Sequence, residues 1–291
     1  MTSYKRQEID GLDIFYRDAG NPNNPAIALF HGFPSASHMF NNLLNKLEDR
    51  FHLIAPDYPG FGNSDAPEPD HFEYTFDHLA DVIEKFLESL NLGSFSVYLQ
   101  GYGGAIGLRI AVKQPESIES LIIQNANAYE VGLMDTWKSI REFWEKRTPE
   151  TEAVVKQSFT EEAIKRRYTD GARKSENVCP DTWMLDCFFM NKPSIERIQL
   201  DLLYDYKNNL LRYPEWHRYF KEYQPPTLIL WGKNDPFFGL AGARAYKRDM
   251  PDTEEVYLDT GHFALEEESD AIVEKIVQFY ANRVHKSENK A

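Results

Sequence analysis

Short apolar runs recur along the chain, and turn-forming residues follow most of them directly. Each run has the length of a buried strand, and the segments between most of the runs carry apolar residues at helical spacing. In HLADVIEKFLESL, residues 78–90, the apolar positions fall on one face of a helix. The predicted strands cover residues 27–30, 51–55, 95–99, 121–124, 227–231 and 255–258.

The alternation of strands and helices predicts an α/β protein. Strands joined by helices of this length form a mostly parallel sheet with helices on both faces. The opening segment differs, because DGLDIFYRDAG at residues 10–20 is typical of an antiparallel hairpin. We expect this hairpin at an edge of the sheet.

The pattern changes between residues 127 and 224, where the sequence is helical, aromatic and charged. In an open α/β sheet, ligands bind at the carboxyl ends of the strands, so a helical insertion between two strands is a candidate lid. We therefore predict a core of residues 1–127 and 223–291 and an inserted helical cap at residues 128–222. The terminal HKSENKA is expected to be frayed.

The net charge and the lack of long apolar segments limit the partners and the location that we expect for this protein. The net charge of −14 argues against nucleic acid or an anionic membrane as the main partner. The N-terminal residues lack the apolar segment of a secretory signal, and no apolar run has membrane-spanning length. We expect a cytoplasmic protein that acts on a small molecule. A homo-oligomer built through the cap or the edge strand is compatible with the sequence, although nothing in it sets the stoichiometry.

The turns after two predicted strands suit an oxyanion hole and a nucleophile. HGFP at residues 31–34 forms a tight turn whose backbone N–H groups can point into a cleft. VYLQGYGG at residues 97–104 has the pattern of a nucleophile elbow, a strand-to-helix turn, with Gly101 at the nucleophile position. A dinucleotide-binding turn is the alternative, but the GxGxxG spacing fails because Ile106 stands where the third glycine belongs.

Two later strand ends supply an acid and a base. Asp235 lies in the turn NDP, and His262 follows the last predicted strand in DTGH. Taken alone, an aspartate in such a turn is as likely to stabilise only the turn as to act in catalysis, and a lone histidine is more often structural. The order of nucleophile position, acid and histidine, each after its own strand, is however the chain order of α/β-hydrolases. This order favours a catalytic interpretation of all three positions.

The sequence resembles the α/β-hydrolase superfamily, and within it the branch of haloalkane dehalogenases and epoxide hydrolases. HGFP, DYPGFGNSD, LQGYGG, WGKNDPFF and TGHFALEE carry the resemblance, which covers almost the whole chain. It implies that an elbow carboxylate attacks an electrophilic carbon and that a histidine-activated water then hydrolyses the ester. The resemblance assigns the base to His262, its polarising partner to Asp235 and the oxyanion hole to the backbone N–H groups of Phe33 and Tyr102. Some members place the acid one strand earlier, where this chain has Asn125 and Asn127.

Two positions weaken the dehalogenase assignment. Phe33 stands where many haloalkane dehalogenases have a halide-binding asparagine, and Tyr102 where they have tryptophan. HGFP is closer to epoxide hydrolases and haloacetate dehalogenases, and epoxide hydrolases use cap tyrosines to protonate the opening ring. Aromatic packing is the alternative role for residues of this kind. The candidate substrate contacts are His31, Tyr129, Trp137, Tyr204 and Tyr206.

Gly101 is the main departure from the family pattern. The branch has aspartate at this position, and esterases, lipases and C–C hydrolases have serine, whereas glycine offers no nucleophile. Two explanations remain open: an active hydrolase inactivated at this position, which the retained Asp235 and His262 favour, or a natural ligand-binding member without catalysis. A serine-type esterase or lactonase without its serine fits the same pattern, and His262 acting directly on water would give only feeble hydrolysis. No HEXXH or paired CXXC motif is present, so neither a metal nor another cofactor is expected.

Overall fold

An eight-stranded sheet forms the centre of the computed structural model, in the order β1-β2-β4-β3-β5-β6-β7-β8. The structure describes residues 1–284, and the segment expected to be frayed, residues 285–291, lies outside them. The six strands from β3 to β8 are all parallel to one another, which confirms the predicted α/β class. These strands are β3 (Ala26–Phe30), β4 (His52–Pro56), β5 (Phe95–Gln100), β6 (Ile118–Gln124), β7 (Thr227–Gly232) and β8 (Glu254–Leu258).

The N-terminal hairpin forms one edge of this sheet. Strands β1 (Ser3–Ile9) and β2 (Leu12–Ala19) pair in antiparallel fashion, and β2 pairs in the same way with β4. The predicted hairpin is therefore confirmed. Strand β1 is mostly exposed and β2 is partly buried, whereas every residue of β3, β4, β5 and β7 is buried. Full burial on both faces explains why the parallel strands are continuous apolar runs in the sequence.

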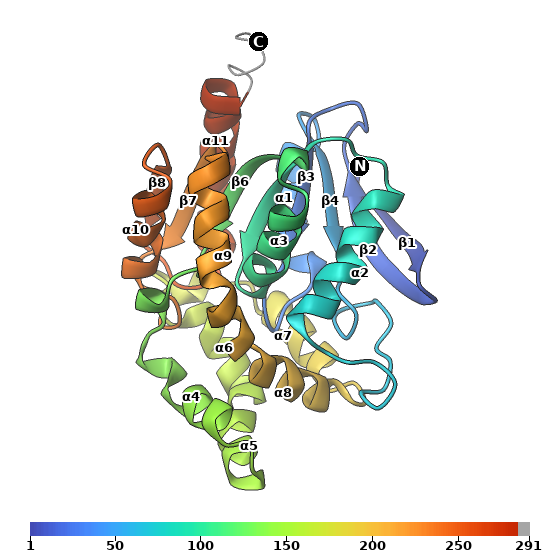
Figure 1. The fold of residues 1–291 in the computed structure, drawn as a ribbon, viewed down its shortest axis with the longest axis vertical. Coiled ribbons are helices and arrows are strands. Elements are labelled where there is room, and N and C mark those ends of the chain that lie inside the picture. The colour runs from blue at the N-terminus through green and yellow to red at the C-terminus, as the bar shows by residue number, and fades with distance from the viewer. Residues whose placement is uncertain (285–291) are drawn as a thin grey trace.

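Helices cover both faces of the sheet (Figure 1). On one face lie α2 (Phe76–Ser89), α3 (Tyr102–Lys113), α9 (Lys207–Tyr223) and α10 (Leu240–Asp249), whose buried side chains belong to one apolar cluster. On the other face, α1 (Asn41–Leu47) packs against α11 (Ala264–Phe279), and a π-helical turn at Tyr280–Val284 follows α11. No helix within residues 1–284 combines the length and the apolar character needed to cross a bilayer.

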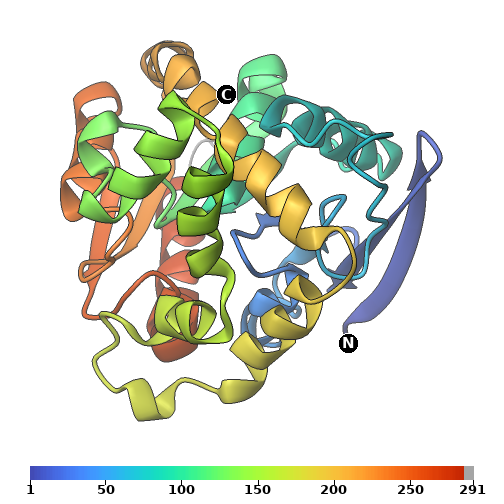
Figure 2. The same ribbon diagram turned by 90° about the horizontal axis from the view of Figure 1, so that it is seen from below.

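The segment between β6 and β7 carries the remaining helices, which gather beyond the carboxyl ends of the strands (Figures 1 and 2). We refer to α4–α8 as the cap. Helix α9 leaves the cap and runs back alongside α3 and α10, so much of it covers the sheet and not the strand ends. The cap helices are α4 (Lys138–Glu145), α5 (Pro149–Lys156), α6 (Glu161–Thr169), α7 (Pro180–Met190) and α8 (Ile195–Asp205).

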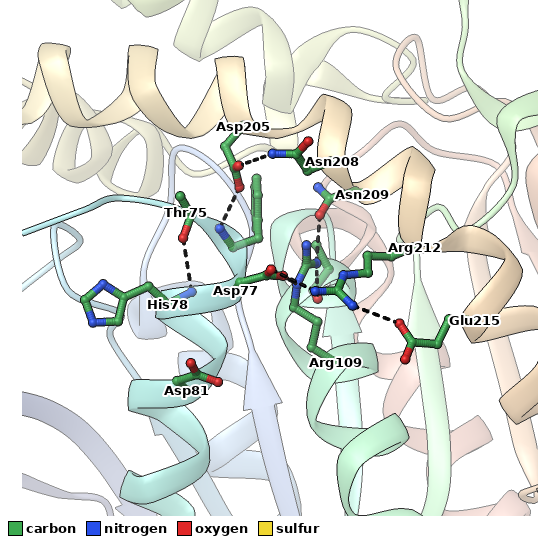
Figure 3. A network of polar contacts seen from close by, with 12 residues as sticks. Thr75, Asp77, His78, Asp81, Arg109, Asp205, Asn208, Asn209, Arg212 and Glu215 are labelled. Carbon is green, nitrogen blue, oxygen red and sulfur yellow. Dashed lines mark hydrogen bonds and ion pairs between the residues drawn. The ribbon is translucent and has the colours of Figure 1, made fainter.

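A polar network ties the returning helix α9 to the helices behind the strand-to-helix turn (Figure 3). The guanidinium of Arg109, on α3, donates to Asp77 on α2 at 2.6 Å and to the side-chain oxygen of Asn209 on α9 at 2.7 Å. Arg212 on α9 donates to the second oxygen of Asp77 at 2.8 Å. The network fixes α3, and with it the turn at which α3 begins, against two neighbouring helices.

Candidate active site

Gly101 forms the sharp turn between β5 and α3. Its backbone has φ +52° and ψ −118°, a conformation that residues with a Cβ rarely adopt. A Cβ at this position would lie 3.6 Å from Nε2 of His262 and 3.2 Å from Cα of Gly32. Position 101 therefore has the backbone of an elbow and faces the imidazole directly.

His262 and Asp235 form a buried pair beside this turn. Nδ1 of His262 lies 2.7 Å from Oδ2 of Asp235. Because a carboxylate accepts hydrogen bonds, the proton belongs on Nδ1, and Nε2 presents its lone pair toward position 101. The other oxygen of Asp235 accepts from the backbone N–H groups of Phe237 and Phe238, at 2.7 and 3.1 Å. These bonds hold the carboxylate in one orientation.

Asn125, at the end of β6, contacts the same carboxylate. Its side-chain amide donates to Oδ2 of Asp235 at 2.8 Å, while its oxygen accepts from the backbone N–H of Gly232 at 2.9 Å. Asn125 and Asn127 mark the alternative location of the acid. In this chain Asn125 orients the acid that follows β7, and Asn127 donates to the hydroxyl of Tyr213 at 3.2 Å.

Gln100 contacts the remaining nitrogen of the imidazole. Its side-chain nitrogen lies 3.1 Å from Nε2 of His262, and with Nδ1 donating to Asp235 the amide of Gln100 is the donor. Gln100 is fully buried, and its side-chain oxygen has no hydrogen-bond partner within residues 1–284. Gln100 stands in the LQGYGG motif, but no role was predicted for it. The available signal was a polar residue at the end of an otherwise apolar strand, immediately before the elbow.

Known proteins share this arrangement of strands and turns. Residues 25–269 match the family described as alpha/beta hydrolase fold. The chain belongs to this family. The match spans most of the sequence, including the elbow, the acid, the histidine and the whole cap, so it concerns the scaffold and not a single motif.

Relatives of this α/β-hydrolase include proteins named as hydrolases. An uncharacterised hydrolase of Saccharomyces cerevisiae is 39% identical over 284 residues, which are 96% of this chain and 97% of the yeast protein. A haloalkane dehalogenase of Mycolicibacterium paratuberculosis is 35% identical over 115 residues, 39% of this chain and 38% of that protein. The solved structure of the epoxide hydrolase CorEH superposes with a TM-score of 0.78 at 18% identity and covers 97% of this chain and 99% of that one. The dehalogenase match confirms the predicted resemblance to that branch, and the epoxide hydrolase structure shows that the fold is shared.

A cavity of about 100 Å³ lies between the elbow of the α/β-hydrolase and its cap. The strand-end loops form its near wall, and the cap forms its far wall. Within residues 1–284 no group of three or more His, Cys, Asp or Glu side chains is arranged to hold a metal ion. The cavity is lined by Phe33, Gly101, Tyr102, Thr136, Trp137, Ser139, Ile140, Val154, Val155, Ser158, Arg167, Leu203, Phe237, Phe238 and His262.

Several of the predicted site residues lie around this cavity. Phe33 and Tyr102 line it, and Tyr102 is the first residue of α3, where the backbone N–H has no acceptor within the helix. Trp137 lines it as well, and its indole N–H donates to the backbone oxygen of Phe237 at 3.0 Å. This bond ties the cap to the loop that carries the acid.

Four predicted substrate contacts are not among the described residues that line the cavity. His31 is buried and stacked on Tyr58, with 3.9 Å between ring centroids, and burial lowers the pKa of His31 to about 3. Tyr206 is buried against Trp137, with 4.5 Å between ring centroids. The hydroxyl of Tyr129 donates to Asp249, the last residue of α10, at 2.8 Å, and so is bonded to a residue outside the cavity wall.

Tyr204 lines a different hollow, beside residues 69–75, and Nζ of Lys207 lies 3.4 Å from the centroid of its ring. His31 was predicted from the HGFP turn, and the three tyrosines from their position in the cap sequence alone. Helical spacing explains the difference, because Leu203, the neighbour of Tyr204, faces inward and lines the cavity instead.

Arg167, on α6, is a cavity residue that no sequence motif marks. Its guanidinium carbon lies 4.7 Å from the ring centroids of both Phe33 and Phe237. Burial lowers the pKa of Arg167 to about 10, so the side chain remains charged at neutral pH. The cap thus contributes a cation to a largely apolar cavity.

Proposed function

We propose that this scaffold hydrolyses a small, apolar organic substrate once a nucleophile stands at position 101, and that the chain with Gly101 is inactive or nearly so. The substrates are an alkyl halide, an epoxide or an ester. The observation that carries the proposal is the 3.6 Å between Nε2 of His262 and the Cβ that a nucleophile at position 101 would have. One or two further atoms on that Cβ bring a nucleophile within reach of both the base and the cavity.

With aspartate at position 101, the reaction has two steps. A carboxylate oxygen forms a bond to the substrate carbon while the bond from that carbon to halide or to the epoxide oxygen breaks, and the leaving group keeps the electron pair. Nε2 of His262 then takes a proton from water, and the resulting hydroxide attacks the carbonyl carbon of the ester. Cleavage of the ester bond releases the alcohol, which takes the remaining proton of the attacking water, and restores the carboxylate. The proton on His262 leaves with the halide or passes to the alkoxide oxygen of the opened epoxide. Asp235 stabilises the imidazolium that forms.

With serine at position 101, the same pair would support acyl transfer. His262 would take the proton of the hydroxyl as its oxygen attacks an ester or lactone carbonyl. In both reactions the backbone N–H groups of Phe33 and Tyr102 are the proposed donors to the oxyanion. Their places at the cavity wall beside position 101 support this role.

A ligand-binding protein without catalysis is the second candidate. The hydrogen bond from Gln100 to Nε2 of His262 favours it, because the lone pair that a base needs already has a partner. The same contact argues against direct activation of water by His262. The retained pair of Asp235 and His262 supports the first candidate, since binding alone requires no base.

The two candidates are separated by restoring the nucleophile. Gly101→Asp and Gly101→Ser are screened against haloalkanes, epoxides and activated esters, with Gly101→Asn as the control of matched size without charge. We expect turnover from one of the first two variants. In Gly101→Asp/His262→Gln the ester intermediate should accumulate, because no base activates the water, and intact-protein mass spectrometry would detect the added alkyl mass.

Hydrolysis as the proposed function would be overturned if neither Gly101→Asp nor Gly101→Ser exceeds the unaltered chain on all three substrate classes while both variants fold. Tight ligand binding by the unaltered chain, together with that result, would establish the binding candidate. Turnover only in the serine variant would identify an esterase or lactonase scaffold.

A further inference from the structure

Arg167 brings hydrogen-bond donors into the cavity that the protein leaves unused. The rings of Phe33 and Phe237 attract its charge, but ring faces are poor substitutes for hydrogen-bond acceptors. Nε of Arg167 is buried and has no hydrogen-bond partner within residues 1–284. A buried polar group without a partner is costly, and such a group in a cavity wall is suited to a ligand.

The carboxylates around Arg167 are engaged elsewhere. Asp235 is bound by His262 and by backbone N–H groups, as described above. Asp186 accepts from the hydroxyl of Tyr168 and lies 3.0 Å from Nε2 of His38. Within the described part of the chain, neither carboxylate forms an ion pair with Arg167. The guanidinium is therefore not explained as the partner of a protein anion.

A second unpaired donor lies beside the same aromatic ring. The hydroxyl of Tyr102 is buried and lacks a hydrogen-bond partner within residues 1–284. The ring of Tyr102 lies 5.6 Å from that of Phe33, whose centroid is 4.7 Å from the guanidinium carbon of Arg167. Both side chains line the cavity next to Gly101. Two donors without a partner in the described residues thus belong to side chains that line the space in which a substrate would lie.

We propose that the cavity is selective for a small organic acid, whose carboxylate is received by Arg167 together with the hydroxyl of Tyr102. The carbon skeleton of the acid would pack against the apolar part of the wall, which includes Trp137, Ile140 and Leu203. Hydrogen bonds from a guanidinium to a carboxylate are strong in a site shielded from water. This inference rests on the proposed function and changes its substrate class at the same site, from a wholly apolar molecule to an alkyl halide, epoxide or ester that also carries a carboxylate.

Position 101 makes equilibrium binding measurable, because a chain without a nucleophile does not consume its ligand. Isothermal titration calorimetry with benzoate and benzamide compares two ligands of nearly equal shape, of which only benzoate is charged. We expect benzoate to bind the unaltered full-length chain at least about tenfold more tightly, since hydrogen bonds to charged groups are stronger than those between neutral groups.

Variants of Arg167 test whether this side chain is the source of the preference. Arg167→Met should remove the preference for benzoate and leave benzamide binding unchanged, whereas Arg167→Lys should retain part of it. Arg166→Gln is the matched control, because Arg166 is the exposed neighbour on the same helix and pairs with Asp170. It should bind both ligands as the unaltered chain does.

The inference is overturned if benzamide binds the unaltered chain as tightly as benzoate, if neither ligand binds, or if the preference survives in Arg167→Met. The comparison in the unaltered chain decides the matter even if an Arg167 variant fails to fold. Benzoate selectivity without turnover in Gly101→Asp or Gly101→Ser would support the acid site and contradict hydrolysis. Turnover of neutral substrates without benzoate selectivity would support hydrolysis and contradict the acid site.

Discussion

Arg109 and Asn209 join two helices that are distant in sequence. The guanidinium of Arg109 donates to the side-chain oxygen of Asn209 at 2.7 Å, and the same guanidinium donates to the backbone oxygen of Ala105 within its own helix. Arg109 is 6% exposed, so its bonds are shielded from solvent. The helix that begins at the elbow is thereby attached to the helix that leaves the cap (Figure 3).

Arg109→Met should destabilise the protein by about 2–3 kcal/mol, because it leaves the buried side-chain oxygen of Asn209 without a donor and removes the bond to Asp77. The measurement is the free energy of unfolding in urea. Arg212→Met is the matched control, because Arg212 shares the partner Asp77 but its side chain is 43% exposed. Loss of an exposed pair of this kind costs about 0–1 kcal/mol. Equal destabilisation by the two variants would show that burial of Arg109 contributes nothing.

Gly101→Ala should lower the free energy of unfolding by about 1–3 kcal/mol, because a Cβ strains a backbone with positive φ. The added Cβ would also press on Cα of Gly32 at 3.2 Å. Gly93→Ala provides the comparison, since Gly93 has φ +70° and nothing within 4 Å of an added Cβ. The Gly93 variant therefore measures the backbone strain without the contact. An alanine at position 101 that leaves stability unchanged or raises it would contradict the strained elbow.

Glu266, on α11, should make stability depend on pH. Burial raises its pKa from 4.5 to about 7, with the hydroxyl of Thr182 donating to the carboxylate at 3.3 Å. Between these two values the folded state holds a proton that the unfolded state releases, so the free energy of unfolding falls as pH rises through this window. Above about pH 7 the loss is complete.

Glu266→Gln removes this titration and keeps an acceptor for Thr182. We expect the variant to be more stable than the unaltered chain by about 2 kcal/mol near pH 8, with the gap closing toward pH 4.5. Urea unfolding at both ends of this range measures the gap. Glu274→Gln, at an exposed position on the same helix, should show no such change across the range. A gap of the same size at both ends would rule out Glu266 as the titrating group.

The strands and the motifs at their ends were predictable because both follow from burial. A strand covered on both faces must be apolar, so β3, β5 and β7 are visible as apolar runs, and the polar residues that end them stand out. The chain order of Gly101, Asp235 and His262 then predicts that the three positions form one catalytic site.

The contacts from the cap were not predictable in the same way. A helix in the cap presents one face to the cavity and another to solvent, and aromatic residues occupy both, so residue type does not distinguish Tyr204 from Trp137. The position of Arg167 in the cavity was not predictable for a related reason, because a basic residue in a charged helix is normally exposed to solvent. Only the packing of α6 against the strand-end loops brings it to the cavity.

The cavity has two walls of different origin. One comes from the loops that follow the strands, and the other from α4, α5, α6 and α8 with the turns beside them. Substitutions in the second wall can exchange one ligand for another while bond-making groups in the first stay untouched. Reactivity and selectivity can accordingly diverge along separate evolutionary routes, and an engineer can alter either without redesigning its counterpart.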